Sequence, residues 1–185
     1  MSELLVLHAV RLKGFADVEV IAGRFGLDRA ETGEQLLDAE AYGLVSRSEF
    51  AGLAGWSLTE RGRARNEALL SEELDRAGAR STVAAVHDRF LPLNAEASRA
   101  FTAWQLETDR STDTFLRLAG ELRALEGELA PRLDRFGGYH ARFDAALRNA
   151  ARDPAWITGI NVDSCHKVWF ELHEDLIATL GITRA

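Results

Sequence analysis

Apolar residues recur every three or four positions through the first part of the chain, which predicts short amphipathic helices. The first helix begins at Ser2, whose side chain suits a helix N-cap, and ends at Gly14. Its inward face consists of Leu4, Leu5, Leu7, His8 and Leu12. The second helix opens at Phe15 and ends at Gly26. Its inward residues are Val18, Ile21, Ala22 and Phe25.

A third helix and a hairpin are expected next. Asp28 is the predicted N-cap of a helix over residues 29–42, which Gly43 ends. Short apolar stretches at residues 44–47 and 55–58 then predict the two strands of a small hairpin. Small and apolar residues form the loop between the strands.

The rest of the chain has a helical pattern. Thr59 is the predicted N-cap of a long fourth helix that ends near Ala77, and Gly78 marks the boundary between domains at residues 1–77 and 78–185. Further helices are expected at about 80–92, 94–106, 112–127, 128–136, 138–151 and 163–180. Breaks or first turns are expected at Pro92, Pro131 and Pro154. The predicted fold is therefore mainly α, with one β-hairpin and an all-α bundle after it.

The order of these elements, together with three short phrases, carries a family resemblance. The phrases are the turn Gly26-Leu27-Asp28, the helix end Tyr42-Gly43-Leu44-Val45, and the helix start Leu58-Thr59-Glu60-Arg61-Gly62-Arg63. Residues 2–75 resemble the MarR-type winged helix-turn-helix regulators. The resemblance implies a homodimer whose third helix enters the major groove of double-stranded DNA while the hairpin, or wing, reaches its backbone. The DNA-binding residues that it implies are Arg29, Thr32, Gly33 and Gln35 on the third helix, Arg47 at the wing base, and Arg61 and Arg63 on the fourth helix.

The charge pattern favours a different partner. The chain has 22 Lys and Arg against 29 Asp and Glu, and its first 76 residues hold 9 of the former against 14 of the latter. Arg29 is the one basic residue of the predicted third helix, whose cap and body carry the acidic residues Asp28, Glu31, Glu34, Asp38 and Glu40. Carboxylates repel a phosphate backbone. A winged helix that binds a protein partner, or a small-molecule sensor that does not bind DNA, is therefore the alternative to a DNA-binding regulator.

The C-terminal segment Asn161–Ile177 is the other distinctive stretch. It loosely resembles the helical extensions of some actinobacterial-type regulators and the regulatory segments attached to enzymes that use phosphoenolpyruvate. Asp163 is its expected N-cap. His166 and His173 lie seven residues apart, about two helical turns, which is too far for both to bind one metal ion. We expect Cys165 to be buried in the packing, and we expect no metal and no cofactor.

An aromatic-lined pocket in the helical bundle is the expected effector site, because such regulators often respond to small molecules. The residues expected around it are Trp104, His140, His166 and Trp169. Core packing explains the same aromatic residues without a ligand.

No enzyme motif is present in the sequence. It lacks the nucleophile elbow G-x-S-x-G, the phosphate-binding loop G-x-x-x-x-G-K, and a pair of cysteines for zinc. Its single cysteine suits a reducing compartment, and neither a signal peptide nor an apolar stretch of membrane-spanning length is found. The sequence therefore predicts a cytoplasmic protein that is not an enzyme.

Overall fold

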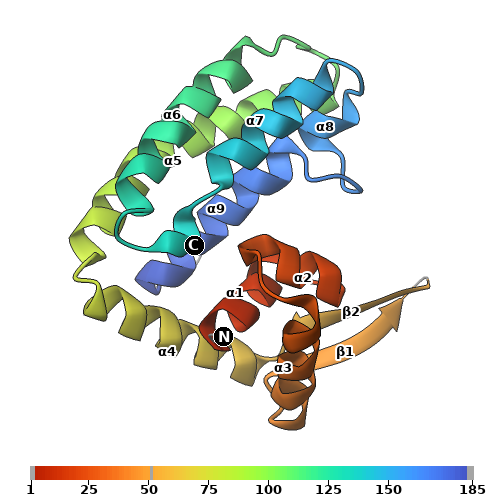
Figure 1. The fold of residues 1–185 in the computed structure, drawn as a ribbon. Helices are drawn as coiled ribbons and strands as arrows, with labels where there is room; N and C mark the ends of the chain where they lie inside the picture. The colour runs from red at the N-terminus through yellow and green to blue at the C-terminus, as the bar shows by residue number, and fades with distance from the viewer. Residues whose placement is uncertain (1–2, 51, 183–185) are drawn as a thin grey trace. The chain divides into compact units, whose positions relative to one another are not determined.

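The computed structural model describes residues 3–50 and 52–182, so the predicted cap Ser2 lies outside the described residues. The chain divides into two compact units, Met1–Glu73 and Leu74–Ala185. This division falls a few residues before the expected boundary at 77/78. Figure 1 shows a mainly helical chain with one small antiparallel sheet of two strands.

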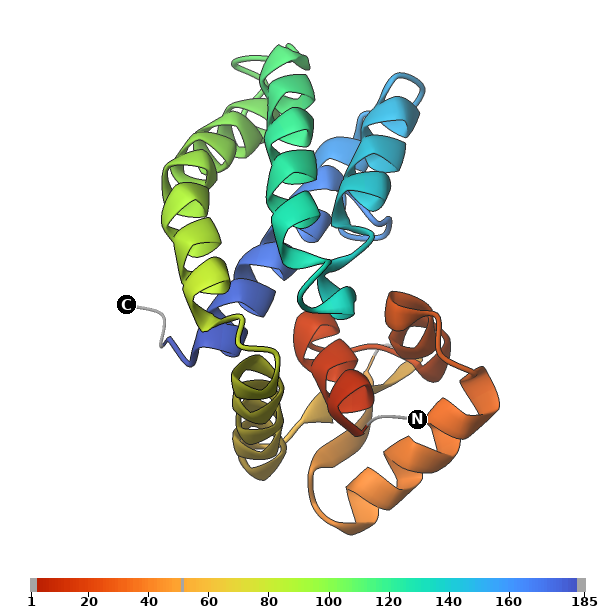
Figure 2. The same cartoon turned by 60° about the vertical axis from the view of Figure 1, so that its left-hand side comes forward.

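Unit 1 contains three short helices, a hairpin and most of a fourth helix. The elements are α1 (Glu3–Lys13), α2 (Val18–Phe25), α3 (Arg29–Ala41), β1 (Val45–Phe50), β2 (Leu53–Leu58) and α4 (Glu60–Arg76). Figure 2 shows α1 between α3 and the first turns of α4. The core of this unit consists of Val6, Leu7, Ala9, Val10, Ala16, Ile21, Leu36, Ala39, Leu44, Val45 and Trp56.

Local caps set the ends of α2 and α3. The Asp17 side chain accepts a hydrogen bond from the Val20 N–H at 2.9 Å, and the Asp28 side chain accepts one from the Glu31 N–H at 2.9 Å. Gly26 ends α2 in a left-handed conformation with φ of 64°, which glycine adopts without steric cost. The predicted cap at Asp28 and the predicted stop at Gly26 are both confirmed.

The hairpin is longer than the sequence pattern predicts. Its strands pair in register from Val45 with Leu58 to Phe50 with Leu53, so the expected loop contributes residues to both strands. Ala16, in the connection between α1 and α2, adds a bridge to Trp56 through two backbone hydrogen bonds of 2.8 and 3.3 Å. This bridge fixes the hairpin to the start of the helical layer.

Polar pairs connect α1 with α4. His8 and Asn66 are both fully buried, with 3.5 Å between the His8 Nδ1 and Asn66 Oδ1 atoms. The Arg65 guanidinium donates two hydrogen bonds to the Glu3 carboxylate, at 3.0 and 2.7 Å. Hydrogen bonding to Arg65 holds the pKa of Glu3 below its ordinary value, so this carboxylate stays ionised at neutral pH.

The start of α4 packs directly on the backbone that leads into β1. Thr59 caps α4 by accepting a hydrogen bond from the Gly62 N–H at 3.0 Å, and its hydroxyl lies within hydrogen-bond distance of the Gly43 and Leu44 carbonyl oxygens. The Thr59 N–H also donates to the Leu44 oxygen at 3.0 Å. A Cβ atom at position 62 would lie 1.8 Å from that same oxygen. The phrase Leu-Thr-x-x-Gly therefore encodes a close approach of helix and strand.

Gly62→Ala should destabilise unit 1 by about 3 kcal/mol, because backbone atoms must move to admit the methyl group. Gly33→Ala is the matched control. A Cβ atom there would meet only the Val18 side chain at an ordinary 3.8 Å, and alanine stabilises a helix by up to about 1 kcal/mol over glycine. Urea denaturation of both variants measures the difference. A Gly62→Ala midpoint at or above that of the wild-type protein would contradict the close approach.

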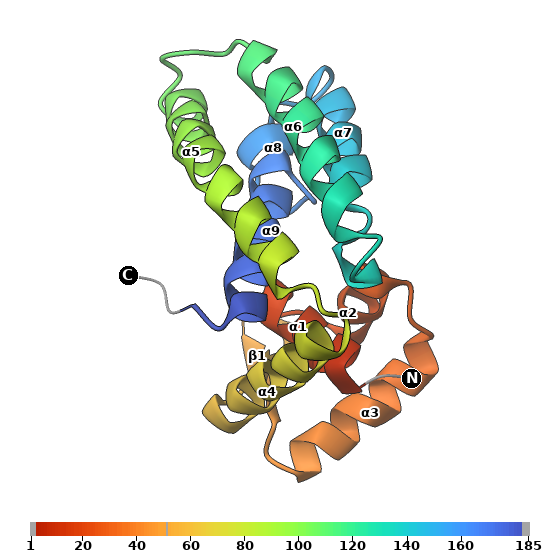
Figure 3. The same ribbon diagram turned by 90° about the vertical axis from the view of Figure 1, so that its left-hand side faces the viewer.

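Unit 2 is an all-helical bundle that the end of α4 leads into. Its elements are α5 (Arg80–Gln105), α6 (Asp113–Leu129), a short 3-10 helix η1 (Asp134–Phe136), α7 (Tyr139–Ala150), α8 (Ala155–Thr158) and α9 (Cys165–Leu180). Figure 3 shows α5, α6 and α7 side by side, with α9 packed along the bundle. Its aromatic core residues are Phe90, Phe101, Trp104, Phe115, Phe136, Tyr139, Phe143 and Trp169.

Three expectations for this unit are wrong. Residues 80–92 and 94–106 form one helix, which contains Pro92 and buries Phe90 and Phe101 on either side of it; the proline removes only one backbone hydrogen bond. The helix expected at 128–136 is replaced by the last residues of α6 and by the 3-10 turn η1. Ser164, rather than Asp163, caps α9 by accepting from the Lys167 N–H.

A buried ionic network joins η1, α7 and α9. Arg135 and Asp175 form an ion pair whose side chains are 1% and 0% exposed. The Tyr139 hydroxyl donates to the second oxygen of Asp175 at 2.8 Å, and Arg135 donates to the Thr179 hydroxyl at 2.8 Å. Each charge is therefore compensated inside the bundle, which is the condition for burying an ion pair without a large cost.

Arg135→Met should destabilise unit 2 by about 3–5 kcal/mol, because it leaves the Asp175 charge buried without its cation. The double variant Arg135→Met/Asp175→Leu should lose less, since it removes both charges. The exposed pair of Arg89 and Glu128 offers the control, because Arg89→Met should leave the unfolding midpoint nearly unchanged. Denaturant unfolding of the three variants tests this order. A double variant less stable than Arg135→Met would contradict it.

Candidate functional site

The exposed side of α3 is acidic. Glu31, Glu34 and Asp38 are exposed and follow one another at helical spacing, so they lie on one side of the helix, which we call the acidic α3 face. Leu37, 54% exposed, lies beside them. Glu40 is also exposed and accepts a hydrogen bond from the Arg47 N–H of β1 at 3.4 Å. This surface presents carboxylates around one apolar side chain.

Arg29 does not offset this charge. Its guanidinium lies 2.9 Å from the Glu19 carboxylate of α2, in a pair whose side chains are 69% and 75% exposed. Such an exposed pair is weak and is screened by salt. Arg29 is solvent-facing as expected, but its charge is shared with a carboxylate from the neighbouring helix.

Two of the expected groove-facing positions are at least half-buried. Thr32 is fully buried, and its hydroxyl donates to the Asp28 carbonyl oxygen at 2.7 Å. Gly33 is half-buried, and a Cβ atom there would point at Val18 of α2. Thr32 shares its buried side of α3 with Leu36 and Ala39, whose side chains lie in the core. The expectation that the Thr32 side chain faces a DNA groove is therefore wrong.

The other basic residues expected to bind DNA come from the hairpin and from α4. Arg47 is exposed, with its guanidinium carbon 5.7 Å from the centre of the Trp56 ring. Arg61 and Arg63 are exposed on the first turns of α4. These three side chains could meet phosphate groups, but none of them belongs to the helix that the resemblance places in the groove.

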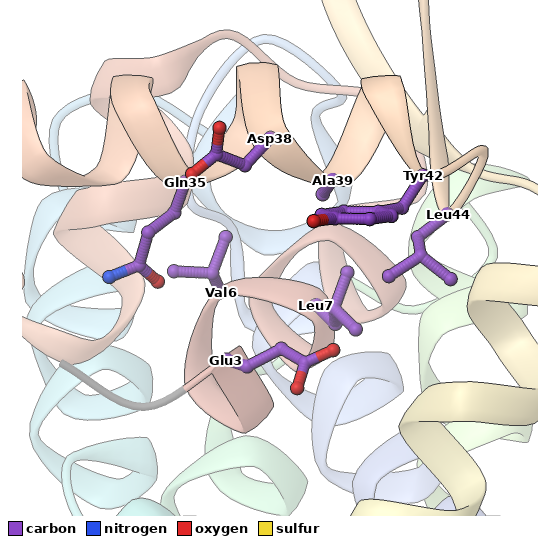
Figure 4. A pocket seen from close by; sticks show the side chains of 8 residues that line it. All are labelled: Glu3, Val6, Leu7, Gln35, Asp38, Ala39, Tyr42 and Leu44. Atoms are coloured by element: carbon purple, nitrogen blue, oxygen red, sulfur yellow. The ribbon is translucent and has the colours of Figure 1, made fainter.

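A pocket of about 310 Å³ opens between α1 and α3. Figure 4 shows the residues that line this α1–α3 pocket: Glu3, Val6, Leu7, Gln35, Asp38, Ala39, Tyr42 and Leu44. Gln35, expected to read DNA bases, is half-buried here, and its Oε1 atom is buried without a hydrogen-bond partner. No sequence pattern predicts this pocket, because its walls come from α1, from α3 and from the residues that follow α3.

The four residues expected around an effector have different packing partners. Trp104 and His166 belong to one aromatic group. Phe115 contacts the rings of both Trp104 and Phe101. The Phe101 ring in turn contacts His166, with ring centres 4.8 Å apart. Burial lowers the pKa of His166, so its ring favours the neutral form.

Trp169 and His140 lie in other surroundings. Trp169 packs against Phe90 and Phe143, and its indole N–H donates to the Asn94 side chain at 3.0 Å. The backbone N–H of His140 donates to Glu126, which lies eleven residues along α6 from Phe115. Eleven residues of helix span roughly 16 Å. His140 is therefore remote from the aromatic group around Trp104, and core packing accounts for both tryptophans.

Cys165 and its neighbours have structural contacts. Cys165 is fully buried, and burial raises the pKa of its thiol to about 12, so it stays protonated and unreactive at neutral pH. Asp163, expected as a cap, instead accepts two hydrogen bonds from Arg142, at 2.8 and 2.7 Å. Among the residues that the structure describes, no three His, Cys, Asp or Glu side chains are placed to hold one metal ion.

Comparison with known proteins gives no relative, because no family model, curated protein or solved structure matches the chain. Within residues 3–50 and 52–182, none of the helices combines the length and the apolar character needed to cross a lipid bilayer.

Proposed function

We propose that unit 1 is a winged helix-turn-helix domain of a regulatory protein, and that it binds a protein partner through the acidic α3 face. The order of three helices, hairpin and fourth helix supports the domain type, as does the close approach of α4 to the Leu44 carbonyl. In this proposal, the helix that reads DNA in other winged-helix proteins binds protein instead.

The exposed acidity of α3 is the observation that carries this proposal. Glu31, Glu34 and Asp38 would lie against the phosphates that line a DNA groove, and like charges there oppose binding. The same carboxylates attract a basic protein surface and raise its rate of association. Leu37 supplies the apolar contact that the centre of a protein interface usually contains.

A DNA-binding regulator is the second candidate, and the exposed arginines favour it. Arg47 on the hairpin and Arg61 and Arg63 on α4 are all accessible to a phosphate backbone. In this candidate the domain binds double-stranded DNA mainly through phosphate contacts from the hairpin and α4, so affinity falls steeply with added salt. Unit 2 would then supply the homodimer contact or the effector response.

Reversing two charges should abolish the proposed partner interaction. Glu31→Lys/Glu34→Lys changes exposed residues only, so the fold should remain while a basic partner is repelled. Crosslinking in cells, followed by mass spectrometry, would compare the proteins captured by the wild-type chain and by this variant. Glu72→Lys/Asp88→Lys is the control, because it changes two exposed carboxylates outside α3 by the same total charge.

Support requires a partner with a basic surface that the wild-type chain and the control capture and the α3 variant does not. Equal capture by all three proteins would contradict the proposal, because the acidic α3 face would then play no part in binding.

A further inference from the structure

We propose that the α1–α3 pocket binds the guanidinium group of an arginine that the partner of the acidic α3 face presents. This inference rests on the proposed function and adds the chemistry of the group that is recognised. Asp38 links the two features, because it belongs to the acidic α3 face and also lines the pocket.

The apolar walls of the pocket favour a ligand with an aliphatic chain. Val6, Leu7, Ala39 and Leu44 line it, with exposed fractions of 2%, 1%, 8% and 9%. A volume of about 310 Å³ is at the lower end of the range for ligand pockets. It therefore suits one side chain rather than a large cofactor. The three methylene groups of arginine can cover these walls while its head stays near the mouth.

The polar groups of the pocket require a hydrogen-bond donor. The Gln35 Oε1 atom is buried and accepts no hydrogen bond, which is unfavourable for a polar atom. The Asp38 carboxylate lies one helical turn further along α3, on the same side of the pocket as Gln35 in Figure 4. Once the Gln35 side chain rotates to expose its oxygen, a ligand that donates to both oxygens satisfies the first and neutralises the second.

Glu3 does not compete for this cation. Both of its carboxylate oxygens accept hydrogen bonds from Arg65, as described above. Its charge is therefore already compensated within unit 1, whereas no ion pair is found for the Asp38 side chain among the described residues. A cation that enters the pocket consequently gains most at the Asp38 end.

Tyr42 distinguishes a guanidinium from other cations. Its ring is 68% exposed and, in Figure 4, lies beside Ala39 and Leu44 with its hydroxyl directed toward the Asp38 side. A planar guanidinium stacks on such a ring and still donates along its edge to two separate acceptors. A lysine ammonium is more strongly hydrated and cannot stack in this way. Arginine therefore fits the apolar walls, the two acceptor oxygens and the Tyr42 ring together.

The test uses the full chain and a model compound, N-acetyl-arginine N-methylamide. Titration is followed in two-dimensional ¹H–¹⁵N NMR spectra, with the lysine and citrulline analogues in parallel. We expect saturable shifts at the amides that line the pocket on α1 and α3. The citrulline analogue keeps the shape and loses the charge, so it should bind at least about five-fold more weakly. The lysine analogue should also bind more weakly than the arginine compound.

Variants separate the pocket from the general charge of α3. Asp38→Asn should weaken binding of the arginine compound by about ten-fold, since hydrogen bonds between charged groups are worth about 1.5–3 kcal/mol. Glu34→Gln is the matched control, because it removes one exposed carboxylate from the same helix outside the pocket, and its affinity should stay near that of the wild-type chain. Tyr42→Ala should weaken binding about three-fold or more through lost stacking, while Tyr42→Phe should bind like the wild-type chain.

Three outcomes would overturn the inference. They are the absence of saturable shifts at the pocket, equal binding of the citrulline analogue, and equal weakening by Glu34→Gln and Asp38→Asn. The last outcome would mean that α3 attracts cations without a specific pocket, and it would leave the proposed function standing. Conversely, specific binding of the arginine compound together with unchanged partner capture by Glu31→Lys/Glu34→Lys would retain the pocket and reject the proposed function.

Discussion

The packing of α4 against the hairpin in unit 1 depends on the Leu44 carbonyl oxygen. It accepts a hydrogen bond from the Thr59 backbone, lies beside the Thr59 hydroxyl, and leaves no room for a side chain at Gly62. These contacts fix the start of α4 against the hairpin. The Leu44 side chain is at the same time a wall of the α1–α3 pocket, and α4 carries the Arg65 that holds Glu3 at the other wall. The junction thereby sets the shape of the candidate site.

The chemistry of the exposed surface differs from what the helix order suggests. A helix-turn-helix with a hairpin resembles a DNA reader, but a fold alone does not determine function. Here α3 exposes carboxylates, and its single arginine shares its charge with Glu19. A residue that could read a base, Gln35, instead lines the α1–α3 pocket and has its side-chain oxygen buried. The surface is consistent with recognition of cations.

Local features were predictable from the sequence, and features that join distant segments were not. The cap at Asp28 and the stop at Gly26 depend on residues within one turn, so their patterns are sufficient. The burial of Thr32 was also predictable. Thr32 lies four residues before Leu36 and seven before Ala39, so the three side chains share one side of the helix. The ion pair of Arg135 with Asp175, forty residues apart, has no sequence pattern. The pocket between α1 and α3 had none either, and α5 continues through Pro92, where the sequence predicted a break.

The most direct test of the central claim is a titration of the full ¹⁵N-labelled chain with a duplex DNA fragment from its own upstream region. At roughly 50 mM salt, phosphate contacts are strong enough to show binding by any groove-reading surface. If the acidic α3 face recognises cations, the amides of residues 29–41 should not shift, and any shifts should be confined to the hairpin and the start of α4. Saturable shifts concentrated between Arg29 and Gln35 would contradict the account and establish α3 as a DNA-reading helix.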